Sequence, residues 1–464
     1  MFCYRVPNGM IIDDNFIHFL LVVGTLSITG VFILLSKIKF RSLLNPVAIY
    51  CFIWGIALVF HITRGSKDFY PLSFSALTMF IVAMGMYAIG GLLAPKIRLS
   101  KVLNQMTDQI QLKSSTLWTF YLIVAWVCLI GSMYFLYTVI NYFGLSTYLT
   151  QGYLVHNILF TEEKAASFPG GIWNYRFIQY VLQPIIYLSA AMAGMFIISE
   201  RKRRKIFYLP LLSTLLFDLA FVGRFRVYTV GLIYFFAVLF RKKYNYRRYI
   251  QTHLKSRKGI FFLVIILIFL TLLSYTGITI IRTYYKDLNF DIYGLSIPEP
   301  IFYILTFQVG GLVYFSECYK DLSSFSYGYE LFYPIFGKLL NFLNITDIQY
   351  EYILNQDYQI GPSLTHRATA TYLFVAYKDF GWLGIFVYPF ILGWVGGYIY
   401  SKHLKSPNIL WKAMLLLYYA LILVSSTVVW GLSDFGRAIA FIMMLAVTLL
   451  FGYKQTFVEI KNNS

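Results

Sequence analysis

The chain repeats long runs of apolar residues, and this repetition constrains its fold more than any other feature. A helix needs roughly 20 apolar residues to cross the hydrocarbon core of a bilayer, and such runs recur between residues 16 and 452. Of the 464 residues, 59% are hydrophobic and 13% are charged, whereas about 25% are charged in a typical soluble domain. The weak alternating segments of a transmembrane β-barrel are not evident. The sequence therefore predicts an all-α polytopic membrane protein.

We expect about 11 transmembrane helices in a single integral membrane domain that covers residues 1–464. The first run is too long for a signal-peptide core and lacks a small-x-small cleavage site, so we interpret it as a retained span. The four cysteines show no CxxC spacing, which predicts neither a disulfide framework nor a metal site. The expected spans are 16–36, 46–62, 72–93, 117–140, 174–198, 207–222, 227–240, 260–280, 382–400, 409–429 and 435–452.

Lysine and arginine concentrate in every second connection between these spans. The alternate connections hold three (37–45), four (94–116), five (199–206), eight (241–259), three (401–412) and two (after 452) basic residues, which is 25 of the 39. Because cytoplasmic loops are enriched in basic residues, we expect these loops inside, the N-terminus outside and the C-terminus inside. Loops of this kind contact anionic lipid, and they explain much of the net charge of +19. Charge spread in this way, without a nucleic-acid-binding fold, argues against nucleic acid as a partner.

Two arginines interrupt the apolar stretch 206–240, in the sequence DLAFVGRFRVYTV (218–230). Both flanking connections are strongly basic, so the stretch is predicted to be a hairpin whose turn, with Arg224 and Arg226, faces outward. Each leg of about 14–16 residues spans about 21–24 Å, short of a hydrocarbon core of roughly 30 Å. We therefore expect the turn to lie below the outer surface, as an anion site in a cavity. The alternative is that both arginines reach up to the lipid headgroups.

Three further segments are expected on the outer side. Segment 281–381 has ten acidic and six basic residues, and it contains an apolar stretch (300–315) and an amphipathic one (330–343). We expect it to form a helical lid of interfacial or re-entrant helices, because a structureless loop of this length is uncommon; a pair of extra spans is the alternative. The others are the smaller loop 141–173 and the turn WGLSDFGR (430–437).

Arginines at the outer ends of several predicted spans are expected to converge on one face. The guanidinium group is a planar fork that binds phosphate in a bidentate manner, so a group of arginines indicates a strongly anionic ligand such as a lipid pyrophosphate. Any one of them alone is more often structural than ligand-binding, so the signal comes from the set. Its members are Arg224, Arg226, Arg282, Arg367 and Arg437.

Residues 361–397 read GPSLTHRATATYLFVAYKDFGWLGIFVYPFILGWVGG. A large outer loop, a Thr/Ala/Tyr-rich helix, Asp379-Phe380-Gly381-x-x-Gly384 and an apolar span follow one another here, which resembles the bacterial O-antigen polymerases, or oligosaccharide repeat unit polymerases. The G-R-x-R turn at 223–226 is similar to an arginine-bearing turn of that family and of the related O-antigen ligases. The resemblance implies a glycosyltransferase C-like fold and an active site that faces the periplasm or cell exterior.

The implied activity joins undecaprenyl-pyrophosphate-linked oligosaccharide repeats into O-antigen, capsule or exopolysaccharide at the cytoplasmic membrane. Donor and acceptor are both lipid-linked oligosaccharides, no metal or cofactor takes part, and a chain-length regulator and a flippase are implied partners. The arginines would stabilise the charge that develops on the leaving pyrophosphate. A ligase-type glycan transferase and a lipid-linked oligosaccharide transporter are the alternatives.

The acceptor hydroxyl needs a general base, and His366, beside Arg367, is the first candidate. In the related ligases a His-Asn pair begins the helix that leads to the acidic-x-Gly-x-x-Gly turn. The corresponding place here is near Thr369-Ala370, one helical turn after His366. Asp379 is the second candidate, although an Asp at this position also suits a cap or a brace for the glycine turn. The Asp434-Phe-Gly triplet is interpreted as coincidence or as a second capping turn.

Overall fold

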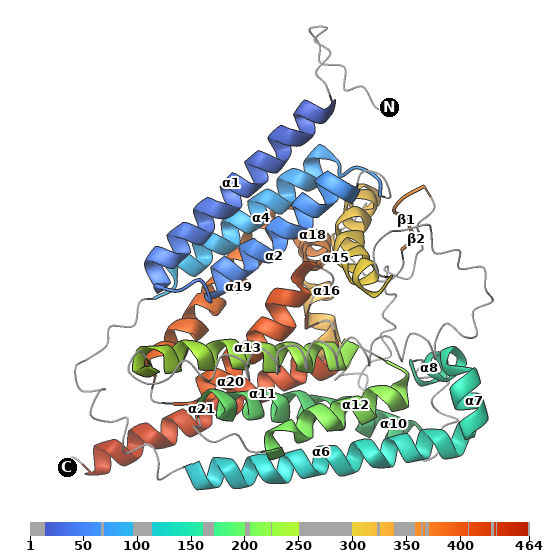
Figure 1. Ribbon diagram of the computed structural model, residues 1–464, viewed down its shortest axis with the longest axis vertical. Helices are drawn as coiled ribbons and strands as arrows, with labels where there is room; N and C mark the ends of the chain where they lie inside the picture. Colours follow the sequence, from blue (N-terminus) through green and yellow to red (C-terminus); the bar gives the residue numbers. More distant parts are fainter. Residues whose placement is uncertain are drawn as a thin grey trace, which may run out of the picture. The chain divides into compact units, whose positions relative to one another are not determined.

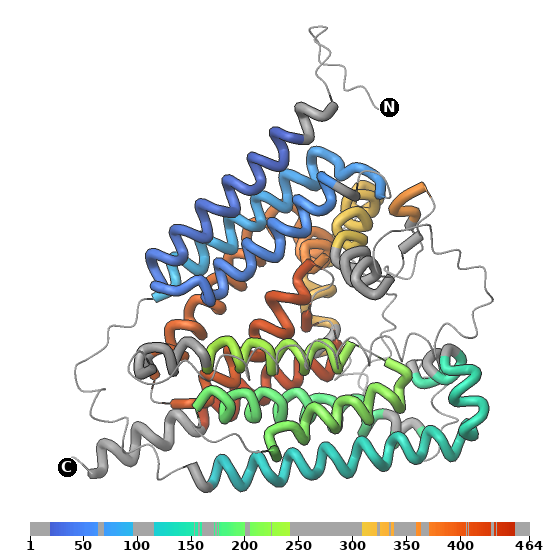
Figure 2. Tube along the Cα trace, in the orientation of Figure 1, coloured from blue at the N-terminus to red at the C-terminus, as the bar shows by residue number. Residues whose placement is uncertain are grey.

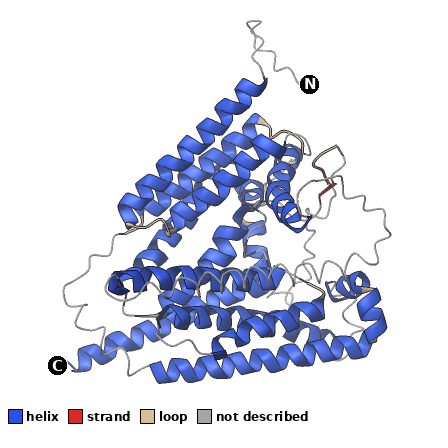
Figure 3. Cartoon of the chain, in the orientation of Figure 1, coloured by secondary structure: helices blue, strands red, loops and turns tan. Residues whose placement is uncertain are grey.

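The described part of the computed structural model is helical, apart from one antiparallel pair of two-residue strands, β1 (Tyr358–Gln359) and β2 (Thr365–His366) (Figure 3). This confirms the predicted helical class. The structure describes residues 14–65, 69–95, 114–160, 171–199, 205–223, 225–249, 299–322, 325–337, 358–362, 365–366, 371–406, 408–427, 431–432 and 434–462.

Seven helices in the described part are long and apolar enough to cross a membrane. They coincide with seven of the predicted spans, which supports the assignment to a membrane. The predicted spans 207–222, 227–240 and 435–452 are also helical, whereas 260–280 lies outside the described residues, so the total of eleven stays a prediction. The seven are Phe19–Phe40, Pro46–Thr63, Phe74–Leu93, Thr116–Phe143, Ile178–Ser199, Trp382–Leu404 and Leu410–Thr427.

The helices group into two compact units, each assembled from separate stretches of the chain, where the sequence alone predicted one domain. The first unit comprises 1–96, 301–401 and 422–433. Its helices α1, α2 and α4, blue in Figures 1 and 2, pack side by side. Its elements are α1 (Asp14–Phe40), α2 (Pro46–Phe60), α4 (Phe74–Leu93), α15 (Glu299–Cys318), α16 (Tyr329–Phe332), β1, β2, α18 (Tyr372–Phe380) and most of α19 (Trp382–Lys405), with short π or 3₁₀ turns at His61–Gly65, Tyr319–Asp321, Tyr333–Gly337 and Val424–Thr427.

Local sequence signals set the starts of two of these helices. The Asn45 side chain accepts a hydrogen bond from the backbone N–H of Ala48 at 2.9 Å and precedes Pro46, the usual order of N-cap and first-turn proline. Ser73 caps α4 in the same way, by accepting from the N–H of Ala76 at 3.2 Å. These caps satisfy backbone donors that the first helical turn leaves unpaired.

The second unit comprises 97–300, 402–421 and 434–464. In the span Ile178–Ser199, 89% of the apolar 18-residue window is buried. This burial arises because α11 packs against α6, α12, α13, α20 and α21. Its elements are α6 (Ser114–Phe143), α7 (Leu145–Thr150), α8 (Gly152–Phe160), α10 (Gly171–Phe177), a π-helical turn (Ile178–Leu182), α11 (Gln183–Ser199), a 3₁₀ turn (Lys205–Tyr208), α12 (Leu209–Phe221), α13 (Phe225–Tyr249), α20 (Leu410–Leu417), a second π-helical turn (Tyr418–Leu423) and α21 (Phe435–Asn462).

Contacts between helix ends agree with the alternation of the predicted spans. The ammonium group of Lys39, after the first span, donates to the carbonyl oxygens of Gly91 (3.1 Å), Leu92 and Ala94 (2.6 Å), at the end of the third. In the second unit, Lys412 at the start of α20 donates to Ser199 at the end of α11 (2.9 Å). Both contacts join ends that the count of basic residues assigns to the cytoplasmic side.

Segment 281–381, predicted to be a lid, is described in part. The apolar stretch 300–315 lies in α15, and the amphipathic stretch is helical from Tyr329 to Gly337. The residues 281–298 and 338–357 lie outside the described part. Helix formation is therefore confirmed for two of its pieces, while their position at the membrane surface stays a prediction.

Close packing of α4 on α19 depends on glycine, and this gives a testable prediction. A Cβ at Gly90 would lie 2.0 Å from the carbonyl oxygen of Phe390, whereas a Cβ at Gly85 would lie 3.6 Å from the Phe32 ring. We expect Gly90→Ala to destabilise the protein by about 1–3 kcal/mol through overpacking, and Gly85→Ala in the same helix to be tolerated. The midpoint of thermal unfolding in detergent measures both; equal midpoints would contradict the observed packing.

Candidate anion-binding site

The hairpin predicted from the sequence is present, and its turn is organised by one aspartate. Helix α12 ends at Phe221, Val222 takes a left-handed conformation (φ 49°), and α13 begins at Phe225. The N–H of Gly223 donates to the carbonyl oxygen of Asp218 at 2.8 Å, and the N–H of Val227 donates to the Asp218 carboxylate at 2.7 Å. Asp218 therefore holds the end of one helix and the start of the next, which fixes the geometry of the turn.

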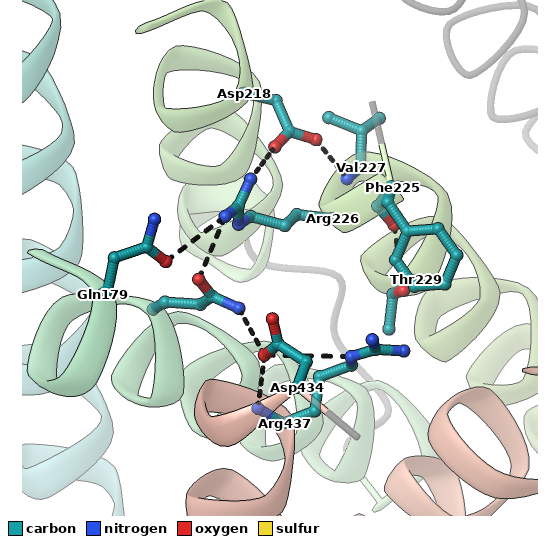
Figure 4. Close-up of polar contacts among 9 residues, drawn as sticks. Gln179, Asp218, Phe225, Arg226, Val227, Thr229, Asp434 and Arg437 are labelled. Carbon is teal, nitrogen blue, oxygen red and sulfur yellow. Dashed lines mark hydrogen bonds and ion pairs between the residues drawn. The ribbon is translucent and has the colours of Figure 1, made fainter. Parts of the chain in front are cut away.

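Arg226 points back into the second unit, where it is 9% exposed. Its Nη1 lies 3.3 Å from a carboxylate oxygen of Asp218, and its Nη2 donates to the amide oxygens of Gln183 (3.1 Å) and Gln179 (3.5 Å) (Figure 4). The guanidinium plane also lies over the Phe221 ring, 4.4 Å from its centroid, a favourable cation–π arrangement. Internal partners thus hold Arg226, which contradicts the alternative that it reaches up to lipid headgroups.

A glutamine and an aspartate connect Arg226 to Arg437. Gln183 accepts from Arg226 through its amide oxygen and donates through its amide nitrogen to Asp434 at 2.8 Å. The Asp434 carboxylate accepts from the backbone N–H of Arg437 at 3.0 Å and lies 3.8 Å from its Nε, while the Arg437 guanidinium lies 4.7 Å from the centroid of the Phe225 ring. Asp434 therefore caps the start of α21, which agrees with the interpretation of the second Asp-Phe-Gly triplet as a capping turn.

The network joins the starts of α11, α13 and α21 to the end of α12. The count of basic residues assigns all four of these helix ends to the outer side of the membrane. The contacts show that the four ends do lie together, as that assignment predicts. The polypeptide is locally π-helical at Ile178–Leu182, where Gln179 lies. Single π-helical turns are frequent at functional sites. Here the turn places Gln179 and Gln183 beside the same guanidinium.

Both guanidinium groups keep one buried nitrogen without a partner in the described part of the chain. These nitrogens are Nε of Arg226 and Nη1 of Arg437, and Arg437 as a whole is 8% exposed. An unsatisfied buried donor costs about 1–3 kcal/mol, and more when it is charged. An anion that accepted from these donors would remove that cost.

Tyr148 on α7 supports the same turn from outside the predicted spans. Its hydroxyl donates to the carbonyl oxygen of Leu219 at 2.5 Å. Burial raises the pKa of Tyr148 to about 12, so the hydroxyl stays protonated and remains a donor at neutral pH.

The structure brings together two of the five predicted arginines. Arg226 and Arg437 share the network described above, whereas Arg224, Arg282 and Arg367 lie outside the described residues, so their convergence stays a prediction. His366 lies in β2, where it pairs with Tyr358 of β1, and the following helix begins only at Tyr372. The expectation that His366 lies about one helical turn before Thr369-Ala370 stays a prediction, because residues 367–370 lie outside the described part of the chain. Its role as a base stays a proposal.

Asp379, the second candidate base, is completely buried in the first unit. One carboxylate oxygen accepts from the Ser326 hydroxyl (2.6 Å) and the N–H of Glu330 (3.0 Å), and the other accepts from the N–H of Leu331 (3.1 Å) and the Tyr388 hydroxyl (2.9 Å). Asp379 thus caps α16 and ties it to α18 and α19. This geometry supports the bracing role that the sequence also allowed.

The glycines after Asp379 shape the junction between α18 and α19. Gly381 has a left-handed φ of 58°, and a Cβ at Gly384 would lie 1.8 Å from the carbonyl oxygen of Ala376. The Asp-Phe-Gly-x-x-Gly motif is therefore explained by a buried cap, a left-handed turn and a close approach of α19 to α18.

Sequence reasoning missed Gln179 and Gln183. Glutamine carries no charge, and its amide gives no spacing signal. Asp218 was visible as the only other charge between Ile206 and Phe240, and its position across the turn from Arg226 was the signal that an ion pair forms.

The bridging role of Gln183 gives a second prediction. Gln183→Met keeps the length of the side chain but removes both hydrogen bonds, so it should lower the free energy of unfolding by about 1–3 kcal/mol. Gln179→Met removes one long bond and should have a smaller effect. Thermal unfolding in detergent compares the two. Equal losses would show that Gln183 does not connect the two arginines.

No group of three or more His, Cys, Asp or Glu side chains in the described part of the chain is arranged to hold a metal ion. Comparison of the chain with family models, with curated proteins and with solved structures gives no match.

Proposed function

We propose that the protein is a glycosyltransferase that polymerises undecaprenyl-pyrophosphate-linked oligosaccharide repeats at the outer face of the cytoplasmic membrane. One observation carries the proposal. Two buried arginines, each with a guanidinium nitrogen that has no partner in the described part of the chain, are joined in one network where the ends of four helices meet. Charged groups at membrane depth are costly and usually mark a functional site. The resemblance of residues 223–226 and 361–397 to the oligosaccharide repeat unit polymerases supplies the reaction.

The charge balance of the network means that a strongly anionic ligand needs further cations from the protein. Arg226 and Arg437 are neutralised by Asp218 and Asp434. In our proposal these carboxylates and Gln183 orient the two guanidinium groups, and Arg224, Arg282 and Arg367 add the positive charge that a pyrophosphate requires. Preorganised guanidinium groups stabilise negative charge without moving during the reaction, which is the most effective form of electrostatic catalysis.

The proposed reaction exchanges one bond at the anomeric carbon of the growing chain. A hydroxyl of the incoming repeat attacks that carbon, and the bond from the carbon to the pyrophosphate oxygen breaks. The hydroxyl proton passes to a base, for which His366 is the candidate, because all of the hydrogen bonds described for Asp379 tie it into the fold. Undecaprenyl pyrophosphate leaves with its new negative charge facing the arginines.

The remaining elements have complementary roles in this proposal. Segment 281–381 and the loop 141–173 both lie on the outer side of the membrane. A flippase delivers the lipid-linked repeats, and a chain-length regulator limits the product, which is O-antigen, capsule or exopolysaccharide.

A glycan gel of the wild type and of a deletion strain tests the proposed function. We expect the deletion to collapse the ladder of long chains to a single attached repeat. Long chains that persist but stay unattached would identify a ligase instead. A complete lack of repeats outside the cell would identify a transporter.

A further inference from the structure

Exposed aromatic rings gather where segment 325–337 meets the junction of α18 and α19 in the first unit. Their exposed fractions range from 36% for Phe380 to 78% for Tyr327. The rings form one surface because Phe332 and Phe380 both lie within 3.7 Å of the Cβ position of Gly328, and Phe325 lies 2.9 Å from that of Gly381. We call this surface the aromatic corner; its rings are Phe325, Tyr327, Phe332, Phe336, Phe380 and Trp382.

The charged side chains of the two segments that form the aromatic corner are turned inward. Residues 325–337 and 372–394 contain three charged side chains, those of Glu330, Lys378 and Asp379, and all three are buried. Lys378 forms an ion pair with Glu330, and Asp379 accepts its four hydrogen bonds from the same two segments. Removing charges from water is expensive even when they are paired. A surface cleared of charge in this way is suited to an environment less polar than water.

The aromatic corner is continuous with the exposed face of a candidate membrane span. Along α19 the side chains of Leu383 (63%), Phe386 (41%), Ile391 (50%) and Trp394 (40%) are exposed at helical spacing. This face has the composition of a lipid-facing helix. The C-terminal end of α19 carries Lys402 and Lys405. The aromatic corner therefore sits at the end of the span that is opposite to the basic end, where aromatic rings collect at the membrane–water interface.

We propose that the aromatic corner lies in the headgroup layer of the outer leaflet, and that the Asp379 hydrogen bonds and the Lys378–Glu330 ion pair hold segment 325–337 at that depth. The occupant of this surface is phospholipid. The proposal concerns the position of the protein in the bilayer, so it stands or falls independently of the glycosyltransferase activity.

Nitroxide labels on the full-length protein in phospholipid nanodiscs test this placement. Cys51, Cys128 and Cys318 are buried and free, so the background needs only Cys3→Ser. Labels at Phe332→Cys and Phe336→Cys are compared with Ile391→Cys, on the exposed face of α19, and with Gln359→Cys, on the exposed side of β1. The measured quantity is the collision rate with oxygen, which prefers lipid, divided by that with a water-soluble nickel chelate.

We expect the ratios at Phe332 and Phe336 to be several-fold above that at Gln359 and below that at Ile391. Ratios equal to that at Gln359 would place the aromatic corner in water and overturn the proposal. Low collision rates with both reagents would mean that protein covers the surface, which would also overturn it.

A second comparison tests the positioning role. Ser326→Ala removes one of the four Asp379 hydrogen bonds and preserves the other three, so the fold should survive. The label at Phe332 should then become more mobile while the label at Ile391 is unchanged. An unchanged label at Phe332 would show that Asp379 does not set the position of the segment.

Discussion

Arg226→Ala is expected to abolish long polymer in a glycan gel. Two effects act together. The substitution removes a guanidinium group from the proposed pyrophosphate site, and loss of one such preorganised donor typically costs about 10²–10³-fold in rate. It also leaves the completely buried Asp218 without its ion-pair partner, and breaking a buried pair in this way destabilises a protein by about 3–5 kcal/mol. The single variant should therefore also be less abundant in the membrane.

A double variant separates these two effects. In Asp218→Asn combined with Arg226→Gln, the buried charges disappear together, and an amide oxygen at position 218 can still accept from the N–H of Val227. We expect this variant to reach the membrane at close to the wild-type level, as an immunoblot of the membrane fraction would show, and to remain without long polymer. Restored polymer would mean that Arg226 serves only the fold.

Asp379→Ala is expected to cause the largest loss of stability. It leaves four donors in the first unit without their acceptor, and each unsatisfied buried donor costs about 1–3 kcal/mol. The helix α16 loses its cap, and Lys378 and Glu330 lose the neighbour that orders their ion pair. The abundance of the protein after membrane extraction and the midpoint of its thermal unfolding measure the loss. A midpoint close to that of the wild type would contradict the bracing role.

Asp379→Asn then distinguishes a brace from a base. The amide keeps the shape of the side chain and one acceptor oxygen, so part of the stability should remain. If Asp379 is a brace, polymer yield per folded protein molecule should stay near the wild-type value. A loss of polymer with unchanged stability would instead identify Asp379 as the general base.

The sequence predicted the helical class and the position of most spans because hydrophobic length is a local property. Runs such as 46–62 and 72–93 are apolar enough to identify a membrane helix without knowledge of their neighbours. The alternation of lysine and arginine also predicted which helix ends meet, as Lys39 and Gly91 do. The turn between α12 and α13 followed from the strongly basic connections on both sides of residues 206–240, which require an even number of crossings.

The composition of the network was less accessible to sequence reasoning. Gln183 and Asp434 are 251 positions apart, and nothing in the local sequence of either indicates the contact. Three of the four partners of Asp379 likewise come from a segment about 50 positions earlier. The extended conformation at His366 depends on its pairing with Tyr358 of a separate strand, which the sequence of residues 361–397 alone does not indicate.

Binding of an isoprenoid pyrophosphate to the purified protein is the most direct test of the proposed anion site. The probe is geranylgeranyl pyrophosphate in EDTA, with geranylgeraniol as the uncharged control, and the measured quantity is the midpoint of thermal unfolding. At a ligand concentration 100 times the dissociation constant, binding adds about 2.7 kcal/mol to the stability. We predict that the pyrophosphate raises the midpoint of the wild type, leaves that of the Asp218→Asn, Arg226→Gln variant unchanged, and that geranylgeraniol shifts neither. An equal shift in both proteins, or no shift in the wild type, would contradict the site.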